Sequence, residues 1–247
     1  MRERGFSLFG GGGRHPLFNI RSEGKDMTTD MERAFWDRSW GTIAPERIAA
    51  YAASLDPAAD AIVTFLQKRG ARRVCDAGCG CGVYGLKLAR FGFSVSGFDI
   101  AEDAVSLAEK LFSESGCSAA GFRQADVLST GYTDGCFDAV VARDVVDHMP
   151  IRQGMAAVRE LLRIVRPGGC VLLTLDKTDD QYEAEPHETN EEGDYLFTGG
   201  KWEGMVFHPY SAREIEKLTD GAAHEVLLAD ENGFLVVLAA GEQTKRS

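Results

Sequence analysis

The sequence predicts an α/β protein with a seven-stranded, mostly parallel sheet, helices on both of its faces and an antiparallel last strand. Five short apolar runs alternate with segments whose apolar residues recur at helical spacing, which is typical of a parallel sheet covered by helices. Two further strand-like runs, 224–229 and 234–239, are separated by a short polar segment that ends in Asn232-Gly233, a strong hairpin signal. The last strand is therefore expected to run antiparallel.

The individual elements follow from local signals. Residues 44–69 carry apolar side chains at helical spacing, and Asp56-Pro57, a good cap and first-turn pair, divides this stretch into two helices. Pro167 and the two glycines after it stop a later helix, and Ser211 is expected to cap another. Further helices are predicted over residues 84–90, 101–112 and 151–165, and parallel strands over residues 72–77, 94–99, 119–125, 137–142 and 170–175.

The chain is expected to form one domain over residues 27–247. Residues 1–26 contain a run of four glycines and no periodic apolar face, so they are predicted to be a flexible leader. Residues 176–210 hold ten acids and two lysines in a long, irregular stretch, which predicts an acidic insertion or lid.

Composition excludes several classes of protein. With 27 basic and 38 acidic residues the net charge is −11, so nucleic acid and anionic membranes are not expected partners. No apolar run is long enough to span a membrane. No secretory signal precedes the six cysteines, so reduced thiols and a cytoplasmic location are expected. Cys75, Cys79 and Cys81 lack the paired spacing of a zinc site, and no metal is expected.

A glycine-rich loop, residues 76–82, leaves the first strand and enters a helix. Glycines at this position let the backbone turn sharply and let a nucleotide-type ligand lie against it. Gly80, Gly82 and Gly85 also satisfy G-x-G-x-x-G, and Asp99 follows at the spacing of a ribose-binding acid in a dinucleotide fold. A nicotinamide-dependent oxidoreductase is therefore an alternative at this point.

The loop Asp76-Ala77-Gly78-Cys79-Gly80-Cys81-Gly82 resembles the signature loop of class I S-adenosylmethionine-dependent methyltransferases. Three further segments, 97–100, 124–127 and 161–169, resemble later motifs of that family in the same order. The resemblance covers about residues 44–241. It implies a Rossmann-like seven-stranded fold, S-adenosylmethionine as cofactor, and transfer of its methyl group to a small-molecule acceptor by in-line displacement.

The resemblance also assigns cofactor-binding positions. It implies that Asp99 binds the ribose, that Asp126 contacts the adenine and that Asp76 lies near the methionine end. Helix capping is the alternative for each acid that follows a strand. The full set of implied cofactor-binding residues is Asp76, Gly78, Cys79, Gly80, Asp99, Ile100, Asp126, Val127, Arg143 and Asp144.

Four residues are candidates for catalysis on the acceptor side. Asp147 and His148 follow the fourth strand, where a general base would be positioned, and helix capping is their alternative. His208 and Tyr210 lie in the insertion that covers the acceptor in this family, and a structural aromatic cluster is their alternative. Trp36 and Trp40 belong either to the opposite wall of the site or to a hydrophobic anchor.

The sequence thus predicts an S-adenosylmethionine-dependent methyltransferase acting on a small molecule, as a monomer or homodimer. Short segments faintly resemble the branch of tellurite-resistance-type methyltransferases. Two alternatives stay open: the oxidoreductase, and a non-catalytic regulatory protein that binds S-adenosylmethionine.

Overall fold

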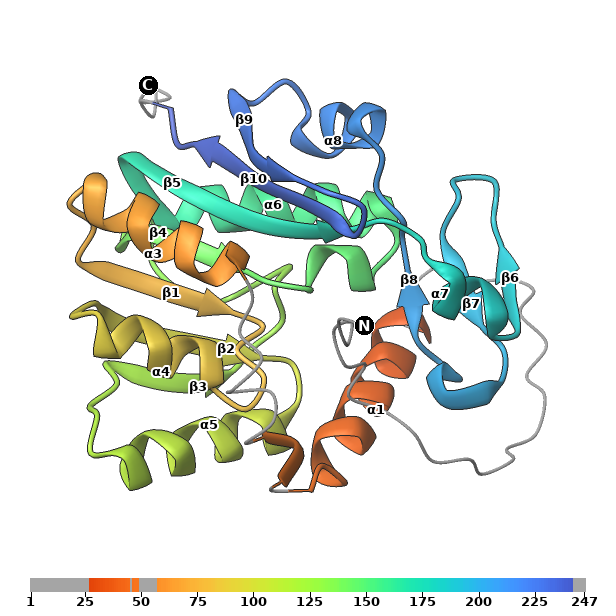
Figure 1. Cartoon of the computed structure of the whole chain (residues 1–247), viewed down its shortest axis with the longest axis horizontal. Coiled ribbons are helices and arrows are strands. Elements are labelled where there is room, and N and C mark those ends of the chain that lie inside the picture. Colours follow the sequence, from red (N-terminus) through yellow and green to blue (C-terminus); the bar gives the residue numbers. More distant parts are fainter. Residues whose placement is uncertain (1–26, 45, 49–56, 242–247) are drawn as a thin grey trace.

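The computed structural model describes residues 27–44, 46–48 and 57–241, so the predicted leader 1–26 and most of the first helix expected within 44–55 lie outside the described residues. Seven strands form one sheet in the order β3-β2-β1-β4-β5-β10-β9 (Figure 1). Strand β10 is antiparallel to both of its neighbours, and all other pairs are parallel. The predicted fold class is confirmed. The strands are β1 (Arg73–Ala77), β2 (Ser94–Asp99), β3 (Gly121–Gln124), β4 (Phe137–Ala142), β5 (Val165–Asp176), β9 (His224–Ala229) and β10 (Gly233–Ala239).

The strand boundaries show which strands local sequence signals predict correctly. Strands β2, β4 and β9 have the predicted bounds, and β3 is shorter than predicted. Strand β5 begins at Val165, before the predicted start at residue 170. Gly168 there has a φ of 76°, and the pairing with β4 shifts register between Phe137 and Ala139. A bulge therefore absorbs the residues that the sequence pattern assigns to a turn.

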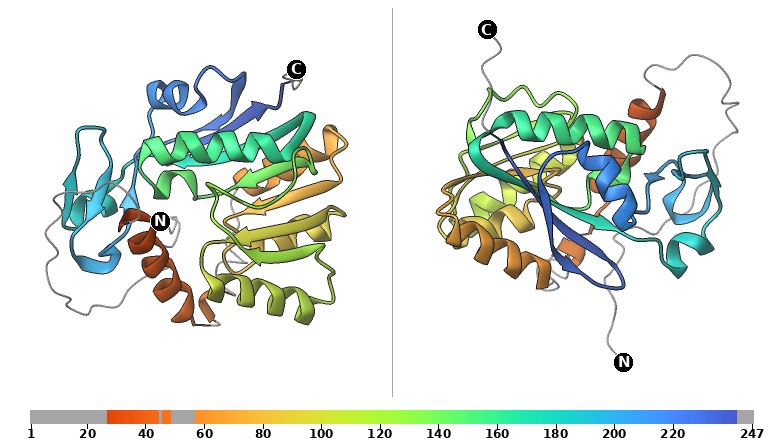
Figure 2. Two further views of the ribbon diagram at one scale, coloured as in Figure 1. Left: turned by 180° about the vertical axis from the view of Figure 1, so that it is seen from behind. Right: turned by 90° about the horizontal axis from the view of Figure 1, so that it is seen from above.

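Helices cover both faces of the sheet (Figure 2). One face packs against α3 (Pro57–Lys68), α4 (Val83–Arg90) and α5 (Glu102–Ser115), and the other against α6 (Ile151–Ile164) and α8 (Ala212–Thr219). The predicted cap of α8 is present as a capping box, in which the Ser211 hydroxyl accepts from the Glu214 N–H and the Glu214 carboxylate accepts from the Ser211 N–H.

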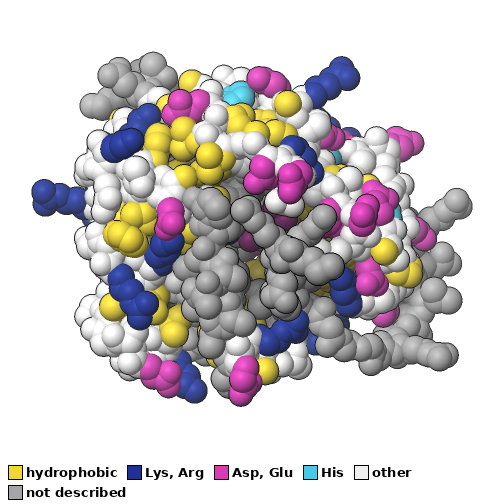
Figure 3. Space-filling view, viewed as in Figure 1, with side chains coloured by type: hydrophobic (Ala, Val, Ile, Leu, Met, Phe, Trp, Pro, Cys, Tyr) yellow, Lys and Arg dark blue, Asp and Glu magenta, His cyan; other side chains and the backbone are white. Residues whose placement is uncertain are grey.

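Residues 176–210 are not irregular, which corrects that expectation. They form α7 (Asp180–Ala184) and a separate antiparallel sheet of β6 (His187–Thr189), β7 (Tyr195–Phe197) and β8 (Val206–Phe207). Tyr182 stacks on Phe207, with ring centroids 4.0 Å apart, and on Trp202 at 4.5 Å. Acidic side chains gather on the surface of this unit (Figure 3). The acids solvate its outside while stacked aromatic rings supply its core.

Helix α1 (Met27–Gly41) lies between the main sheet and the small one (Figure 1). Phe35 is buried among the aromatic residues of the small sheet. Five residues further on, Trp40 packs with Cys81 and Ala104 beside α5. Helix α1 therefore joins the two units. Within the described residues, no helix has the length and apolar character needed to cross a bilayer.

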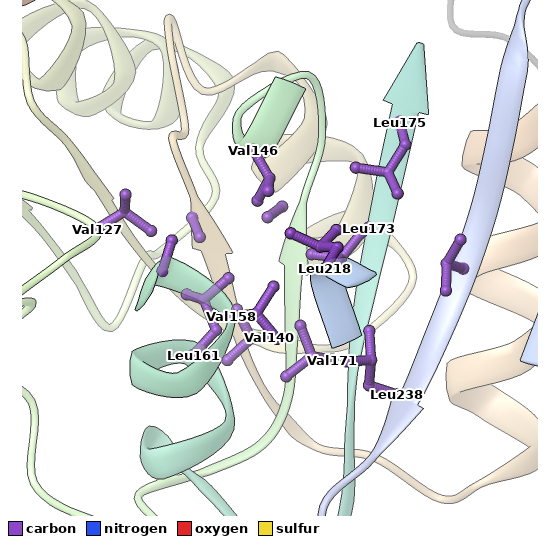
Figure 4. Packing of buried hydrophobic residues seen from close by; sticks show 14 of the residues in the cluster. Val127, Val140, Val146, Val158, Leu161, Val171, Leu173, Leu175, Leu218 and Leu238 are labelled. Atoms are coloured by element: carbon purple, nitrogen blue, oxygen red, sulfur yellow. The ribbon is translucent and has the colours of Figure 1, made fainter. Parts of the chain in front are cut away.

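The larger hydrophobic core lies between the sheet and α6 (Figure 4). Val140 and Leu173 from neighbouring central strands meet Val158 and Leu161 from α6, and Leu238 of β10 closes the cluster. Each of these side chains is at most 2% exposed, and burying one stabilises the fold by roughly 1.5–3 kcal/mol. This packing makes the strand ends a rigid base for the site.

Candidate active site

A cavity of about 620 Å³ opens at the carboxyl ends of the central strands. The strand order reverses between β1 and β4, and the crevice at such a reversal is the usual ligand site of an open α/β sheet. Its walls come from the glycine loop, the ends of β2, β4 and β5, one face of α1, helix α7 with the segment before β8, and the β9–β10 hairpin. This volume is in the range of small-molecule sites.

The glycine loop joins β1 to α4 with backbone conformations that side chains rarely adopt. Gly78, Gly80 and Gly82 have φ angles of 65°, 49° and 79°. A Cβ on Gly80 would lie 2.7 Å from the Trp40 ring, so this loop and α1 pack without space for a side chain. The Cys79 N–H donates to the carbonyl of Phe98 at 2.9 Å, which ties the loop to β2.

Asp99 ends β2 and lines the cavity. Its Oδ2 accepts from the Gly80 N–H at 2.9 Å and its Oδ1 from the Ala101 N–H at 3.0 Å. Burial raises the pKa of Asp99 to about 6, against the effect of these hydrogen bonds. Each oxygen keeps a second lone pair, so the fixed carboxylate is able to accept from two neighbouring hydroxyls.

Asp76 lies one residue before the end of β1 and is also buried against the cavity. Burial raises its pKa to about 7, while the charge of Arg143 and a hydrogen bond from the Gly85 backbone lower it. The Arg143 guanidinium lies 5.0 Å from the ring centroid of Tyr84. Asp76 and Arg143 thus place charges of both signs at this end of the cavity.

The segment after β3 forms the next part of the wall. Asp126, Val127 and Ile100 all line the cavity. The Asp126 Oδ1 accepts from the Leu128 N–H at 2.8 Å, so this carboxylate also stabilises its own turn. The turn-stabilising alternative is thus observed at Asp126, and its second oxygen, which that bond does not use, is able to accept from a ligand in the cavity.

The loop after β4 brings Asp144 and His148 to the cavity. Asp144 has a φ of 53°, and its Oδ1 accepts from the Thr174 hydroxyl at 2.7 Å. The backbone of Val206 hydrogen-bonds the His148 imidazole, and Nδ1 has no hydrogen-bond partner among the described residues, so Nε2 makes that bond. Burial lowers the pKa of His148 to about 4, so the ring is neutral at pH 7 with its lone pair on Nδ1.

Asp147 is fully buried and is not part of the cavity wall. Its Oδ2 accepts from the Asp176 N–H at 3.3 Å, and its backbone carbonyl accepts from the His208 N–H at 2.7 Å. Burial and the nearby carboxylates of Asp176 and Asp144 raise its pKa well above the usual range. Oxygen atoms of these three acids lie within 4.8 Å of one another.

His208 and Tyr210 lie behind the cavity and not in its wall. The His208 Nδ1 donates to the Asp194 Oδ1 at 2.8 Å, and the same oxygen accepts from the Ile151 N–H at 2.9 Å. The Asn190 amide donates to the other oxygen at 2.7 Å. These bonds fasten the insertion to the first turn of α6, and they lower the pKa of Asp194 although burial opposes them.

Replacing Asp194 by alanine is expected to lower the free energy of unfolding by about 2 kcal/mol or more, because His208 and the Ile151 N–H then lose a buried acceptor. Thermal or urea unfolding measures this loss. Asp180→Ala, in the same insertion but exposed, is the control and should change stability by less than about 0.5 kcal/mol. Equal losses of stability in both variants would contradict the role of Asp194 in fastening the insertion to α6.

Several cavity residues were missed by the sequence analysis. Glu32 of α1 is 7% exposed, and burial together with Asp126 raises its pKa to about 8. Its spacing of four residues from Trp36, and of eight from Trp40, was the available signal. Both tryptophans line the cavity, which is one of the two alternatives predicted for them, and Trp36 also contacts the His148 ring, with centroids 5.1 Å apart. Other wall residues that were missed are Tyr84, Thr174, Asp176, Tyr182, Trp202 and Met205.

Comparison with known proteins agrees with this geometry. Residues 74–169 match the model of a family described as a methyltransferase domain. Over 104 residues the chain is 31% identical to a ubiquinone biosynthesis O-methyltransferase of Paracidovorax citrulli, and over 101 residues 36% identical to a 2-methyl-6-phytyl-1,4-hydroquinone methyltransferase of Synechocystis sp.. The matched segments cover 42% and 40% of this chain, but 43% and 30% of those relatives, so the chain spans less than half of either one.

A solved structure extends the likeness of fold. The 1,6-didemethyltoxoflavin-N1-methyltransferase of Burkholderia thailandensis, with bound S-adenosylhomocysteine, matches with a TM-score of 0.66 and 16% identity, covering 91% of this chain and 94% of that chain. Residues 74–169 thus match a methyltransferase domain, and the seven-stranded fold around them is the fold of class I S-adenosylmethionine-dependent methyltransferases. The resemblance of its glycine loop to that class is thereby confirmed.

Proposed function

We propose that this protein transfers a methyl group from S-adenosylmethionine to a small-molecule acceptor. The observation that carries the proposal is the placement of Asp99, whose two oxygens are held by backbone N–H groups of the glycine loop and of α5 while the carboxylate faces the cavity. A ribose diol requires such a fixed pair of acceptors. In-line methyl transfer then depends mainly on the alignment of donor and acceptor.

The donor extends from this point in two directions. Asp126 lies on the side where the adenine amine would donate, with Val127 and Ile100 as apolar neighbours. Asp76 and Arg143 lie at the other end, where the carboxylate of Asp76 favours the ammonium group of the donor and the guanidinium of Arg143 favours its carboxylate. The backbone of Gly78, Cys79 and Gly80, with Asp144 opposite, closes around the methionine portion.

The acceptor side is formed by His148 together with Trp36, Tyr182 and Trp202. The Nδ1 lone pair of His148 is able to accept a hydrogen bond from the acceptor and to orient it, while the low pKa makes the ring a weak base. Asp147 lies one layer deeper and positions the backbone at the end of β5. We assign His208 and Tyr210 to the structure of the insertion, and the insertion itself to the cover of the acceptor.

We further propose that the protein works in the cytoplasm as a monomer or homodimer. The six cysteines are all free, and burial raises the pKa of the Cys75 and Cys79 thiols well above the usual range. Unpaired, unreactive thiols support a reducing compartment.

Calorimetric titration of the full chain with S-adenosylmethionine and with S-adenosylhomocysteine tests the donor. Both should bind at pH 8, and NADH should not. Because the donor binds the ionised forms of Asp76 and Asp99, with pKa values of about 7 and 6, affinity should fall as pH is lowered through 7 and then 6. An acceptor screen with labelled donor follows once binding is established.

Three other results would favour a different function or contradict the assigned residue roles. Binding of NADH alone would favour the oxidoreductase. Binding of both sulfur ligands without turnover across a broad acceptor panel would favour a regulatory protein. An affinity for S-adenosylhomocysteine that does not change between pH 8 and pH 5 would contradict the roles of Asp76 and Asp99.

A further inference from the structure

Three carboxylates converge at the ends of β4 and β5, beside the proposed donor site. Asp144 follows β4, Asp147 lies three residues later, and Asp176 ends β5. One oxygen of each lies within 4.8 Å of the other two, a spacing that a single ion can bridge with bonds of ordinary length. The charged groups that shift the pKa of Asp147 are Asp176 and Asp144, and both raise it.

Asp147 supplies an independent observation. Its side chain is fully buried, and its Oδ1 has no hydrogen-bond donor among the described residues. A buried carboxylate oxygen without a donor loses the full free energy of its hydration, so such atoms require a proton or a cation. The neighbouring cation, Lys177, is engaged elsewhere: its Nζ donates to the carbonyl of Asp230 and lies 4.4 Å from the Phe234 ring centroid.

The wall of the whole cavity is also mainly acidic. Arg143 and Lys177 are the cationic side chains among the described residues of its wall, and Arg143 lies beside Asp76. The acids in the wall are Glu32, Asp76, Asp99, Asp126, Asp144, Asp176, Asp179, Asp230 and Glu231. Such an excess of acids lowers the free energy of any cation inside.

We propose that Asp144, Asp147 and Asp176 bind a divalent cation that prefers oxygen ligands, such as Mg²⁺ or Mn²⁺. Asp144 and Asp176 reach the ion from the cavity wall, and the donor-free oxygen of Asp147 binds it from beneath. Three carboxylates leave further coordination positions for water or a ligand oxygen, as hard cations require.

A bound ion would activate a hydroxyl of the acceptor for methyl transfer, and this part of the inference rests on the proposed function. A hydroxyl of the acceptor that coordinates the cation is more acidic, so its oxygen is a better nucleophile. The oxygen–methyl bond would then form while the carbon–sulfur bond breaks, the sulfonium would become the neutral thioether, and the hydroxyl proton would pass to water. Cation binding by itself does not depend on this step.

The test uses the full chain, freed of metal with a chelator and then titrated with Mn²⁺ while free Mn²⁺ is followed by electron paramagnetic resonance. We expect one saturable site, competition by Mg²⁺, and a rise in melting temperature as the site fills. Asp147→Asn and Asp176→Asn should each weaken Mn²⁺ binding by about tenfold or more. Asp180→Asn removes an equal charge from an exposed position nearby and should bind Mn²⁺ like the unaltered chain.

The outcomes separate this inference from the proposed function. No saturable Mn²⁺ or Mg²⁺ binding by the folded chain up to about 10⁻³ M, the weak end of oxygen-ligand sites, would overturn it. Unchanged binding in both cluster variants would do so too. Should Asp147→Asn fail to fold, Asp176→Asn, whose side chain is only partly buried, decides the matter. S-adenosylhomocysteine titrated into the metal-free chain reports the donor site alone.

Discussion

Replacing Asp99 by alanine should weaken the binding of S-adenosylhomocysteine by about 30-fold or more. Two hydroxyl groups of the ribose then lose a charged acceptor, and hydrogen bonds to charged groups contribute about 1.5–3 kcal/mol each. His148→Ala should change this affinity by less than about threefold, because His148 is assigned to the acceptor side. Calorimetric titration of both variants at pH 8 gives the comparison.

The same substitution removes the partners of the Gly80 and Ala101 N–H groups, so loss of structure has to be separated from loss of the ribose contact. Asp99→Asn keeps the shape and one carbonyl oxygen, and is expected to fold while still binding the ligand more weakly than the unaltered chain. Asp103→Ala, an exposed acid in α5, is the matched control. Equal losses from Asp99→Ala and His148→Ala would refute the division of the cavity into donor and acceptor sides.

Gly82→Ala should lower the free energy of unfolding by about 2–5 kcal/mol, because it combines strain with overlap. Gly82 has a φ of 79°, and an added Cβ would lie 2.8 Å from both the Cα and the Cβ of Ala108 in α5. The clash involves backbone, so it cannot be relieved by rotating a side chain. Urea unfolding with and without S-adenosylhomocysteine measures the change.

Gly70→Ala isolates the contribution of the backbone conformation. Gly70 has a φ of 65°, and no atom lies within 4 Å of its added Cβ. It should lose only about 1–2 kcal/mol, the cost of a left-handed conformation. Identical losses at the two positions would mean that the contact between the glycine loop and α5 adds nothing.

The sequence was most informative where one segment contains the whole signal. The glycine loop, the bounds of β2 and β4, and the position of Asp99 at the end of a strand all follow from patterns a few residues long. The hairpin of β9 and β10 followed from Asn232-Gly233. Alternation of strands and helices then fixed the fold class, because few arrangements satisfy it.

Features that depend on contacts between distant segments could not be predicted from the sequence. His208 looked like an acceptor residue because it lies in the insertion, but its partner Asp194 is fourteen residues away and reaches it only through the small sheet. The convergence of Asp147 with Asp176 requires the ends of β4 and β5 to be neighbours. Glu32 lies on a helix over residues 27–41 that local sequence patterns do not predict.

Helix α1 has a consequence for the order of events in turnover. Trp40 packs on the glycine loop, Trp36 on His148, and Phe35 on the small sheet. One element thus forms part of the wall on both sides of the cavity. A ligand that shifts α1 from one side would change the affinity on the other side, and by reciprocity the second ligand would change the affinity for the first by the same factor.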